Sequence, residues 1–193
     1  MGELADARIL YLHGFRSSPA SWKIRLLGER LAATGLADCL LCPALSHIPN
    51  EAIAQAETLI QASKTPPTLI GSSLGGYYAT WLAEKYGLRA ALINPAVIAP
   101  LSLSEHLGMQ TNLHTGETFE FTAAHIDELR ALDAGHITAS RYLLLVETGD
   151  EVLDYRAAVA RYAGCQQIVL EGGDHSFTRF PEFVPQILEF CGL

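Results

Sequence analysis

Short, continuous apolar runs alternate along this chain with longer stretches of helical hydrophobic periodicity. Such runs, which lack the polar–apolar alternation of a half-exposed strand, are typical of parallel strands that helices cover on both faces. The predicted strands are residues 8–12, 39–41, 68–71, 90–93, 141–147 and 167–170. The predicted helices between them are residues 20–34, 51–63, 74–86, 155–162 and 181–190. This order predicts an α/β fold of three layers, with a mainly parallel sheet between helices on both faces.

Residues 96–140 interrupt this alternation. The segment contains the turn-forming residues Asn112 and Gly116 and one short predicted helix at residues 124–132. A connection of this length inside a compact domain is usually functional, so we expect it to form a small lid or cap. An ordinary surface excursion is the alternative. The 193 residues suit one domain, so we expect a single domain over residues 1–193 with this segment inserted in it.

The strongest local signal lies where the third predicted strand meets the third predicted helix. Gly71-Ser72-Ser73-Leu74-Gly75 fits the pattern G-x-S-x-G, in which a serine occupies a tight turn from strand to helix. Side chains two positions before and two positions after this serine would collide, which explains the two glycines. The turn projects the hydroxyl from the top of the sheet, and the helix N-terminus stabilises negative charge that develops there. Ser73 is therefore the predicted nucleophile, and Ser72 is a rival without glycines at both offsets.

A serine hydroxyl becomes a good nucleophile when a base takes its proton. In a fold with this turn, an acid and then a histidine follow the serine along the chain. His175 follows the last predicted strand in a glycine-rich loop, where the base is expected. Asp150 directly follows the preceding strand, from which its carboxylate would orient the imidazole. Asp154 and Glu147 are the alternatives for that carboxylate, and Asp154 would also suit the N-cap of the next helix.

A tetrahedral oxyanion needs two aligned N–H donors. One is expected from Leu74, the residue after the predicted nucleophile, and the other from Phe15 in the loop after the first strand. Gly14 in that loop allows close approach of the backbone. His13 is expected to hold the loop by hydrogen bonds. Its use as the base is the alternative, which its position before Ser73 in the chain disfavours.

The overall charge limits the partners of this chain. The formal net charge is -8 and the pI about 5.3, so we expect no nucleic-acid partner and no attraction to anionic lipid. Residues 1–6 contain Glu3 and Asp6 where a secretion signal has basic residues, and the first apolar run is too short for membrane insertion. Cys39 and Cys42 have the spacing of a metal-binding pair, but no second pair completes a zinc site. We therefore expect a cytoplasmic protein without metal, cofactor or disulfide framework.

Several short motifs are spread over most of the chain. In the predicted body of the domain they are Tyr11-Leu-His-Gly-Phe15, Gly71-Ser-Ser-Leu-Gly-Gly-Tyr-Tyr-Ala-Thr80, Ile93-Asn-Pro-Ala96, Thr148-Gly-Asp-Glu-Val-Leu-Asp-Tyr155 and Gly172-Gly-Asp-His-Ser-Phe177. In the inserted segment they are Gln110-Thr-Asn112, Thr115-Gly-Glu117 and His125-Ile-Asp-Glu-Leu129. Together these motifs resemble the small bacterial esterases of the YqiA type, in the α/β-hydrolase superfamily. The resemblance implies a cytoplasmic enzyme that hydrolyses carboxylic esters, with acyl thioesters as further substrates. Carried over by position, it implies the triad Ser73, Asp150 and His175.

These residues predict a serine hydrolase that cleaves a small-molecule acyl ester or thioester through an acyl-enzyme on Ser73. An acyltransferase is one alternative, because the same triad can pass the acyl group to an alcohol or an amine. A non-catalytic α/β-hydrolase-fold protein that only binds a ligand is the other. Such proteins generally lack a triad residue, whereas this sequence has all three. The oligomeric state is left open.

Overall fold

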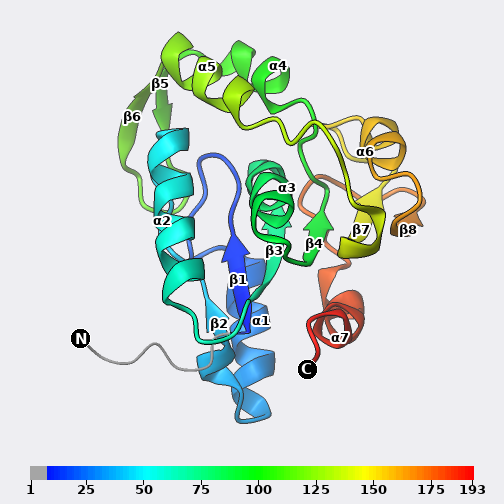
Figure 1. The fold of residues 1–193 in the computed structure, drawn as a ribbon. Helices are drawn as coiled ribbons and strands as arrows, with labels where there is room; N and C mark the ends of the chain where they lie inside the picture. The colour runs from blue at the N-terminus through cyan, green and yellow to red at the C-terminus, as the bar shows by residue number, and fades with distance from the viewer. Residues whose placement is uncertain (1–7) are drawn as a thin grey trace.

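A computed structural model describes residues 8–193 of the protein, so the acidic residues 1–6 lie outside the described part. Six parallel strands form the main sheet, in the order β2-β1-β3-β4-β7-β8 (Figure 1). They are β1 (Ile9–Leu12), β2 (Leu40–Leu41), β3 (Thr68–Ser72), β4 (Ala90–Ile93), β7 (Tyr142–Glu147) and β8 (Gln166–Leu170). Each corresponds to a predicted strand, with ends that differ by at most one residue. The predicted parallel sheet is confirmed.

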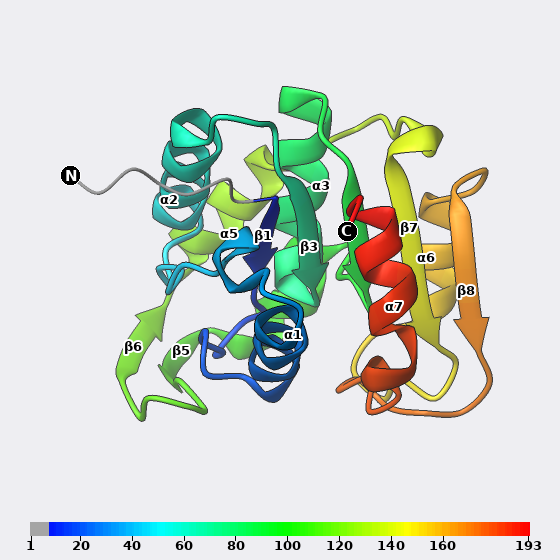
Figure 2. The same ribbon diagram turned by 90° about the horizontal axis from the view of Figure 1, so that it is seen from below.

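Helices cover both faces of this sheet (Figure 2). One face carries α1 (Trp22–Ala33) and α7 (Phe180–Phe190), and the other carries α2 (Pro49–Ala62), α3 (Leu74–Tyr86) and α6 (Tyr155–Arg161). The strands divide their side chains accordingly. Ile9 and Tyr11 of β1 pack with α1 and α7, whereas Leu10 and Leu12 pack with the second group. The predicted three-layer α/β fold is therefore confirmed.

The central strands form the middle of the core. All four residues of β1 are at most 1% exposed, and all four of β4 are 0% exposed. Because both faces of these strands are covered, every position has to be apolar, which produces the continuous runs seen in the sequence. Each fully buried Leu or Ile contributes roughly 1.5–3 kcal/mol to folding.

Local signals fix where the helices begin and end. Helix α1 begins at Trp22 instead of at residue 20, because the N–H of Ala20 donates to Oγ of Ser18 in a turn that precedes the helix (3.1 Å). Helix α2 begins at Pro49, before the predicted start, because proline at the first helical position loses no hydrogen bond. Helix α3 ends before Gly87, whose φ of 69° is the left-handed conformation of a helix C-cap.

Residues 96–140 contain more regular structure than predicted. The elements are α4 (Ala99–Leu103), β5 (Gly108–Thr111), β6 (Thr118–Phe121) and α5 (Ala123–Ala131). Three single-turn 3₁₀ helices, Ala37–Cys39, Ser104–His106 and Ala139–Arg141, complete the described elements. Helix α5 corresponds to the predicted helix, whereas α4 and the antiparallel hairpin β5–β6 were not predicted. Phe119 and Phe121 of β6 belong to the same hydrophobic cluster as the buried residues of α2 and α3. The role of the segment as a lid stays a prediction.

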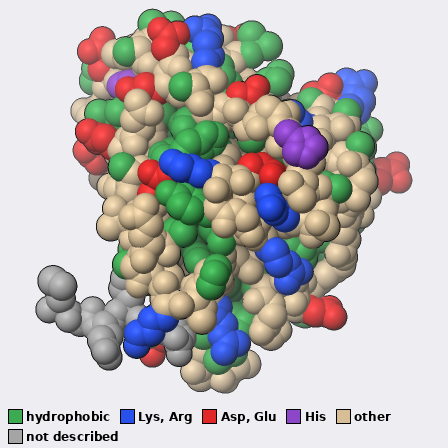
Figure 3. All heavy atoms as spheres, viewed as in Figure 1, with side chains coloured by type: hydrophobic (Ala, Val, Ile, Leu, Met, Phe, Trp, Pro, Cys, Tyr) green, Lys and Arg blue, Asp and Glu red, His purple; other side chains and the backbone are tan. Residues whose placement is uncertain are grey.

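The surface drawn in Figure 3 carries hydrophobic side chains in a band near its centre, with acidic and basic side chains around it. Large exposed apolar side chains include Leu101, Met109 and Leu113, all within residues 96–140. Of the helices described, none combines the length and the apolar composition that crossing a membrane requires.

The turn from β3 into α3 packs directly against the end of β1. A Cβ atom added to Gly75 would lie 1.9 Å from the carbonyl oxygen of Leu12, and one added to Gly71 would lie 2.5 Å from the carbonyl oxygen of Gly75. Both neighbours are backbone atoms, which cannot rotate away as a side chain can. The two glycines therefore let the ends of β1 and β3 touch the first turn of α3.

Gly75→Ala should destabilise the protein by about 2–3 kcal/mol, because the new methyl group overlaps the carbonyl of Leu12. Gly28→Ala is the matched control within a helix, since its Cβ would meet only a leucine methyl 3.9 Å away. That control should gain roughly 0.5–1 kcal/mol from its higher helix propensity. Urea unfolding of the three proteins measures both effects, and a Gly75→Ala protein as stable as the wild type would contradict this account.

Candidate active site

Ser73 lies between β3 and α3 with φ 55° and ψ -122°. A non-glycine residue rarely adopts a positive φ, and residues held in this way are concentrated at functional sites. Its N–H donates to the carbonyl oxygen of Ile93 (3.1 Å), and its own carbonyl accepts from the N–H groups of Gly76 (2.9 Å) and Ala96 (3.0 Å). The tight turn predicted at this position is present. Ser73 is partly exposed, whereas the rival Ser72 is only 7% exposed.

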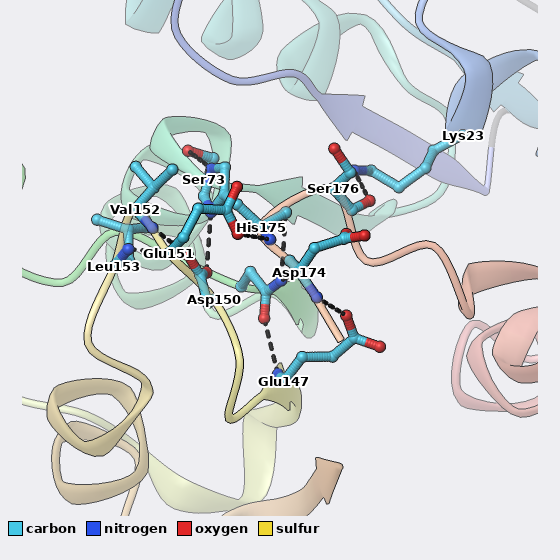
Figure 4. A network of polar contacts seen from close by, with 11 residues as sticks. Lys23, Ser73, Glu147, Asp150, Glu151, Val152, Leu153, Asp174, His175 and Ser176 are labelled. Atoms are coloured by element: carbon cyan, nitrogen blue, oxygen red, sulfur yellow. Dashed lines mark hydrogen bonds and ion pairs between the residues drawn. The ribbon is translucent and has the colours of Figure 1, made fainter. Parts of the chain in front are cut away.

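His175 lies on the loop after β8 and points toward Ser73 (Figure 4). Its Nε2 lies 3.1 Å from Oγ of Ser73, and its Nδ1 lies 2.8 Å from Oδ2 of Asp150. With a hydrogen on Nδ1, the imidazole presents the lone pair of Nε2 to the serine hydroxyl. The structure thus brings together three residues that the sequence predicted, from loops that follow β3, β7 and β8.

The carboxylate of Asp150 has partners on both oxygens. Its Oδ1 accepts hydrogen bonds from the N–H groups of Val152 (2.9 Å) and Leu153 (2.8 Å), while Oδ2 faces His175. The side chain is 2% exposed. Charge-assisted hydrogen bonds compensate a buried carboxylate for the water it has lost. This carboxylate can therefore orient the imidazole and stabilise it when it becomes protonated.

The two alternative carboxylates have other partners. Glu147 is fully buried and accepts hydrogen bonds from Nε of Arg179 (2.7 Å) and from the N–H of Asp174 (2.7 Å). Asp154 is the N-cap of α6 and accepts from the N–H of Arg156 (3.0 Å), the role that the sequence offered for it. Glu147 therefore supports the histidine loop, and Asp154 supports a helix.

Two buried polar side chains that the sequence analysis did not single out hold the loop around His175. Nδ2 of Asn94 donates to the carbonyl oxygens of Asp174 (3.0 Å) and His175 (3.2 Å). Nζ of Lys23 donates to the carbonyl oxygen of Ser176 (2.8 Å) (Figure 4). Two sequence signals were available: Asn94 directly follows a predicted strand, and Lys23 lies on the apolar face of a predicted helix.

The loop after β1 lies beside the serine. A Cβ added to Gly14 would lie 3.1 Å from Cβ and 3.6 Å from Oγ of Ser73, so the loop backbone lies close to the serine and a side chain here would have to displace it slightly. His13 holds the loop in place. Its Nδ1 lies 3.0 Å from the carbonyl oxygen of Gly14, and its Nε2 accepts a hydrogen bond from the N–H of Leu45 (3.1 Å). These are the loop-holding hydrogen bonds that the sequence predicted for His13.

Phe15 and Leu74, the predicted oxyanion donors, line one cavity together. Leu74 is the first residue of α3, so its N–H has no acceptor within the helix. The ring of Phe15 packs edge-on against Phe121 and Phe119 of β6, with ring centroids 5.0 and 5.9 Å apart. The core side of the hairpin therefore holds Phe15 in place.

The hairpin β5–β6 is also joined to the loop after β1 through hydrogen bonds. Nε of Arg16 donates to the carbonyl oxygen of Thr111 (2.9 Å), and Nδ2 of Asn112 donates to the carbonyl oxygen of Ser17 (2.8 Å). The N–H of Leu113 donates to the carbonyl oxygen of Arg16 (2.8 Å). The inserted segment is thus joined to the part of the site that contains Phe15.

Two cavities flank the loop after β1 and share residues 13–15 and Ser17 as a common wall. We call the first the serine cavity; it measures about 300 Å³ and is also lined by Ser73, His175 and Lys23. We call the second the tyrosine cavity; it measures about 320 Å³ and is also lined by Leu74, Tyr78 and Phe119. Each has the size of a site for a small molecule or for one half of a larger one.

Comparisons with known proteins agree with this fold. A family model described as Uncharacterised protein family (UPF0227) matches residues 8–192. A UPF0227 protein from Shewanella sediminis (strain HAW-EB3) is 25% identical over 186 residues, which cover 93% of this chain and 96% of that protein.

Two solved structures have the same architecture at low sequence identity. Alpha/beta hydrolase domain-containing protein 10 from mouse superposes with a TM-score of 0.74 at 16% identity, covering 100% of this chain and 92% of its own. The monoacylglycerol lipase of Paleococcus ferrophilus superposes with a TM-score of 0.68 at 17% identity, covering 95% of this chain and 93% of its own. The protein therefore has the α/β-hydrolase fold, and its chain belongs to Uncharacterised protein family (UPF0227).

Proposed function

We propose that the protein is a serine hydrolase that cleaves carboxylic esters or acyl thioesters through an acyl-enzyme on Ser73. The observation that carries this proposal is the continuous line of contacts from Oγ of Ser73 through the imidazole of His175 to the carboxylate of Asp150, at 3.1 and 2.8 Å. A serine hydroxyl alone is a weak nucleophile. A base within hydrogen-bond distance, oriented in turn by a buried carboxylate, is the arrangement that activates it.

The reaction proceeds in two acyl transfers. Oγ of Ser73 attacks the carbonyl carbon while His175 takes the hydroxyl proton on Nε2. The bond to the alcohol or thiol then breaks, and His175 returns the proton to the departing oxygen or sulfur. Water next attacks the acyl carbon while His175 takes a proton from it on Nε2. His175 then returns this proton to Oγ of Ser73 as the bond between Oγ and the acyl carbon breaks, which releases the acid and restores the hydroxyl. Asp150 stabilises the imidazolium that forms in each half.

The N–H groups of Phe15 and Leu74 are the proposed donors to the tetrahedral oxyanion. The close packing of Gly14 against Ser73 supports this role, because it brings the loop backbone to the side of the nucleophile. The N-terminus of α3 adds a favourable dipole at the same point. Preorganised donors of this kind typically lower the barrier by about 3–4 kcal/mol each.

The cavities favour a small substrate. Two spaces of about 300 and 320 Å³ on either side of one loop suit the two halves of a short ester. The similar fold of a protein named as a monoacylglycerol lipase supports an ester as the bond that is cleaved. A thioester fits the same chemistry, because the attacked carbon is the same and a thiol replaces the alcohol.

Ser73→Ala should lower kcat for 4-nitrophenyl acetate and butyrate by roughly 10⁴-fold or more, because no other group can form the acyl-enzyme. Ser72→Ala is the matched control and should keep most of the activity. The same pair should be tested with acyl thioesters and with a fluorophosphonate probe, which should label the wild type and Ser72→Ala only. Turnover that survives in Ser73→Ala but disappears in Ser72→Ala would overturn the assignment, and the absence of both labelling and turnover would favour a binding protein.

Asp150→Asn should lower kcat by about 10²–10⁴-fold, because the amide cannot stabilise the imidazolium or hold its tautomer. Asp154→Asn is the matched control. Asparagine caps a helix as well as aspartate does, and the ion pair with Arg156 is solvent-exposed, so its loss should matter little. Steady-state kinetics on the same esters compare the two, and a larger loss in Asp154→Asn would show that the acid is misassigned.

The loop that carries Phe15 depends on a neutral His13. Burial lowers the pKa of His13 below its ordinary value of 6.5, an effect that the carbonyl of Gly14 partly opposes. Nε2 of the neutral ring accepts the N–H of Leu45, and a proton on that nitrogen would replace a hydrogen bond with a repulsive contact. The folded protein therefore takes up this proton less readily than the unfolded chain does.

This difference makes His13 a source of acid sensitivity. Stability should fall as the pH drops through 6.5 toward the lowered pKa of the folded state, by at most about 1.4 kcal/mol per pH unit. Urea unfolding at about pH 7.5 and about pH 5.5 should show a larger loss for the wild type than for His13→Gln, which cannot titrate. Equal losses in the two proteins would contradict the inferred shift.

A further inference from the structure

The charge of the serine cavity differs from that of the whole chain. The sequence contains 21 Asp and Glu residues, yet no carboxylate occurs among the described residues that line this cavity. Its wall combines serine and tyrosine hydroxyl groups with the side chain of a single lysine, Lys23, and with no arginine among the described residues. The tyrosine cavity, in contrast, is lined by both Arg16 and Glu117. A ligand in the serine cavity therefore meets a positive charge that no carboxylate in the same wall balances.

Lys23 lines this cavity, and its ammonium group contacts another lining residue. Its Nζ donates to the carbonyl oxygen of Ser176 at 2.8 Å and lies 5.6 Å from the ring centroid of Trp22. Lys23, Trp22 and Ser176 all line the serine cavity together with Ser73 and His175. An ammonium has three N–H donors, and one is used by Ser176. No acceptor for the other two is found among the described residues.

Lys23 keeps its charge at neutral pH although it is only 8% exposed. Burial lowers its pKa to about 8, while Asp174, Glu147 and Asp150 favour the charged form. Glu147 pairs with Arg179 and Asp150 contacts His175. The Asp174 side chain, in contrast, contacts only the hydroxyl of Thr178 among the described residues and therefore partly offsets the charge of Lys23. A cation this well buried attracts an anionic ligand more strongly than a surface lysine does, because water screens it less.

The position of His175 identifies which half of a substrate meets Lys23. The imidazole has to return its proton to the departing oxygen or sulfur, so the alcohol or thiol has to lie beside His175. His175 lines the serine cavity and is not among the described residues that line the tyrosine cavity. The departing half therefore occupies the serine cavity, which Ser73 also lines.

We propose that the alcohol or thiol half of the substrate carries an anionic oxygen group, of which a carboxylate is the simplest, and that this group pairs with Lys23. The inference rests on the proposed function, since it names the substrate class of the same site. Recognition of this kind would let a strongly acidic protein select an anionic ester that its overall charge repels.

The test compares esters that differ only in the charge of the departing half. We would measure kcat/KM for 3- and 4-carboxyphenyl butyrate and for the corresponding neutral carboxamides, using the wild type, Lys23→Met and Lys23→Arg. Lys23→Met should lower kcat/KM for the anionic esters at least about tenfold more than for the neutral ones. Lys23→Arg should keep most of the preference. Lys23→Met also removes the hydrogen bond to the carbonyl oxygen of Ser176. Any resulting change in the histidine loop affects both esters, so it cancels when the anionic ester is compared with the neutral one.

The remaining outcomes each count for or against the proposal. An equal loss for charged and neutral esters in Lys23→Met would overturn it, because Lys23 would then act only through the loop. The two esters 4-nitrophenyl hydrogen glutarate and 4-nitrophenyl butyrate differ in the charge of the acyl half. If Lys23 favours the anionic ester in this pair instead, the anionic group does not belong to the departing half and the proposal is wrong. If the wild type cleaves none of these esters, the proposed function fails by itself. Binding of 3- and 4-hydroxybenzoate and of their methyl esters, measured by calorimetry on the wild type and Lys23→Met, then decides the role of Lys23 without turnover.

Discussion

The close packing of backbone around Gly75 is the constraint on which the rest of the site depends. The ends of β1 and β3 meet the first turn of α3 with no room for a single added carbon atom. This contact brings the loop after β1 beside Ser73 and holds the serine in its strained conformation. Because one contact positions both the proposed nucleophile, Ser73, and the loop of Phe15, their relative geometry does not depend on flexible side chains.

The histidine loop is positioned in a different way. Residues 172–173 are glycines with φ of 71° and 78°, and a loop with such residues has little stiffness of its own. Asn94, Glu147 and Lys23 hold this loop from the end of β4, from β7 and from α1. Three buried polar side chains thus give His175 a fixed position that its own segment could not supply.

Local patterns in the sequence predicted the six strands and the meeting of Ser73 with His175 and Asp150, because all three residues follow strands that end at the same edge of a parallel sheet. The hairpin of residues 108–121 was missed, since four alternating residues are too few to distinguish a strand from a loop. Asn94 and Lys23 were missed for another reason. Asn94 follows a strand and Lys23 lies on an apolar helix face, but neither signal shows that the partner is a backbone carbonyl of the histidine loop.

The bonds between the hairpin and the loop after β1 have a consequence for the timing of catalysis. If residues 96–140 swing outward to admit a substrate, the hydrogen bonds of Arg16 and Asn112 break together with the contact of the Phe15 ring. The open form would then lack a fixed position for Phe15, one of the two proposed donors to the oxyanion. Entry and bond cleavage would become mutually exclusive states, so a molecule that enters but does not let the segment close would leave unchanged.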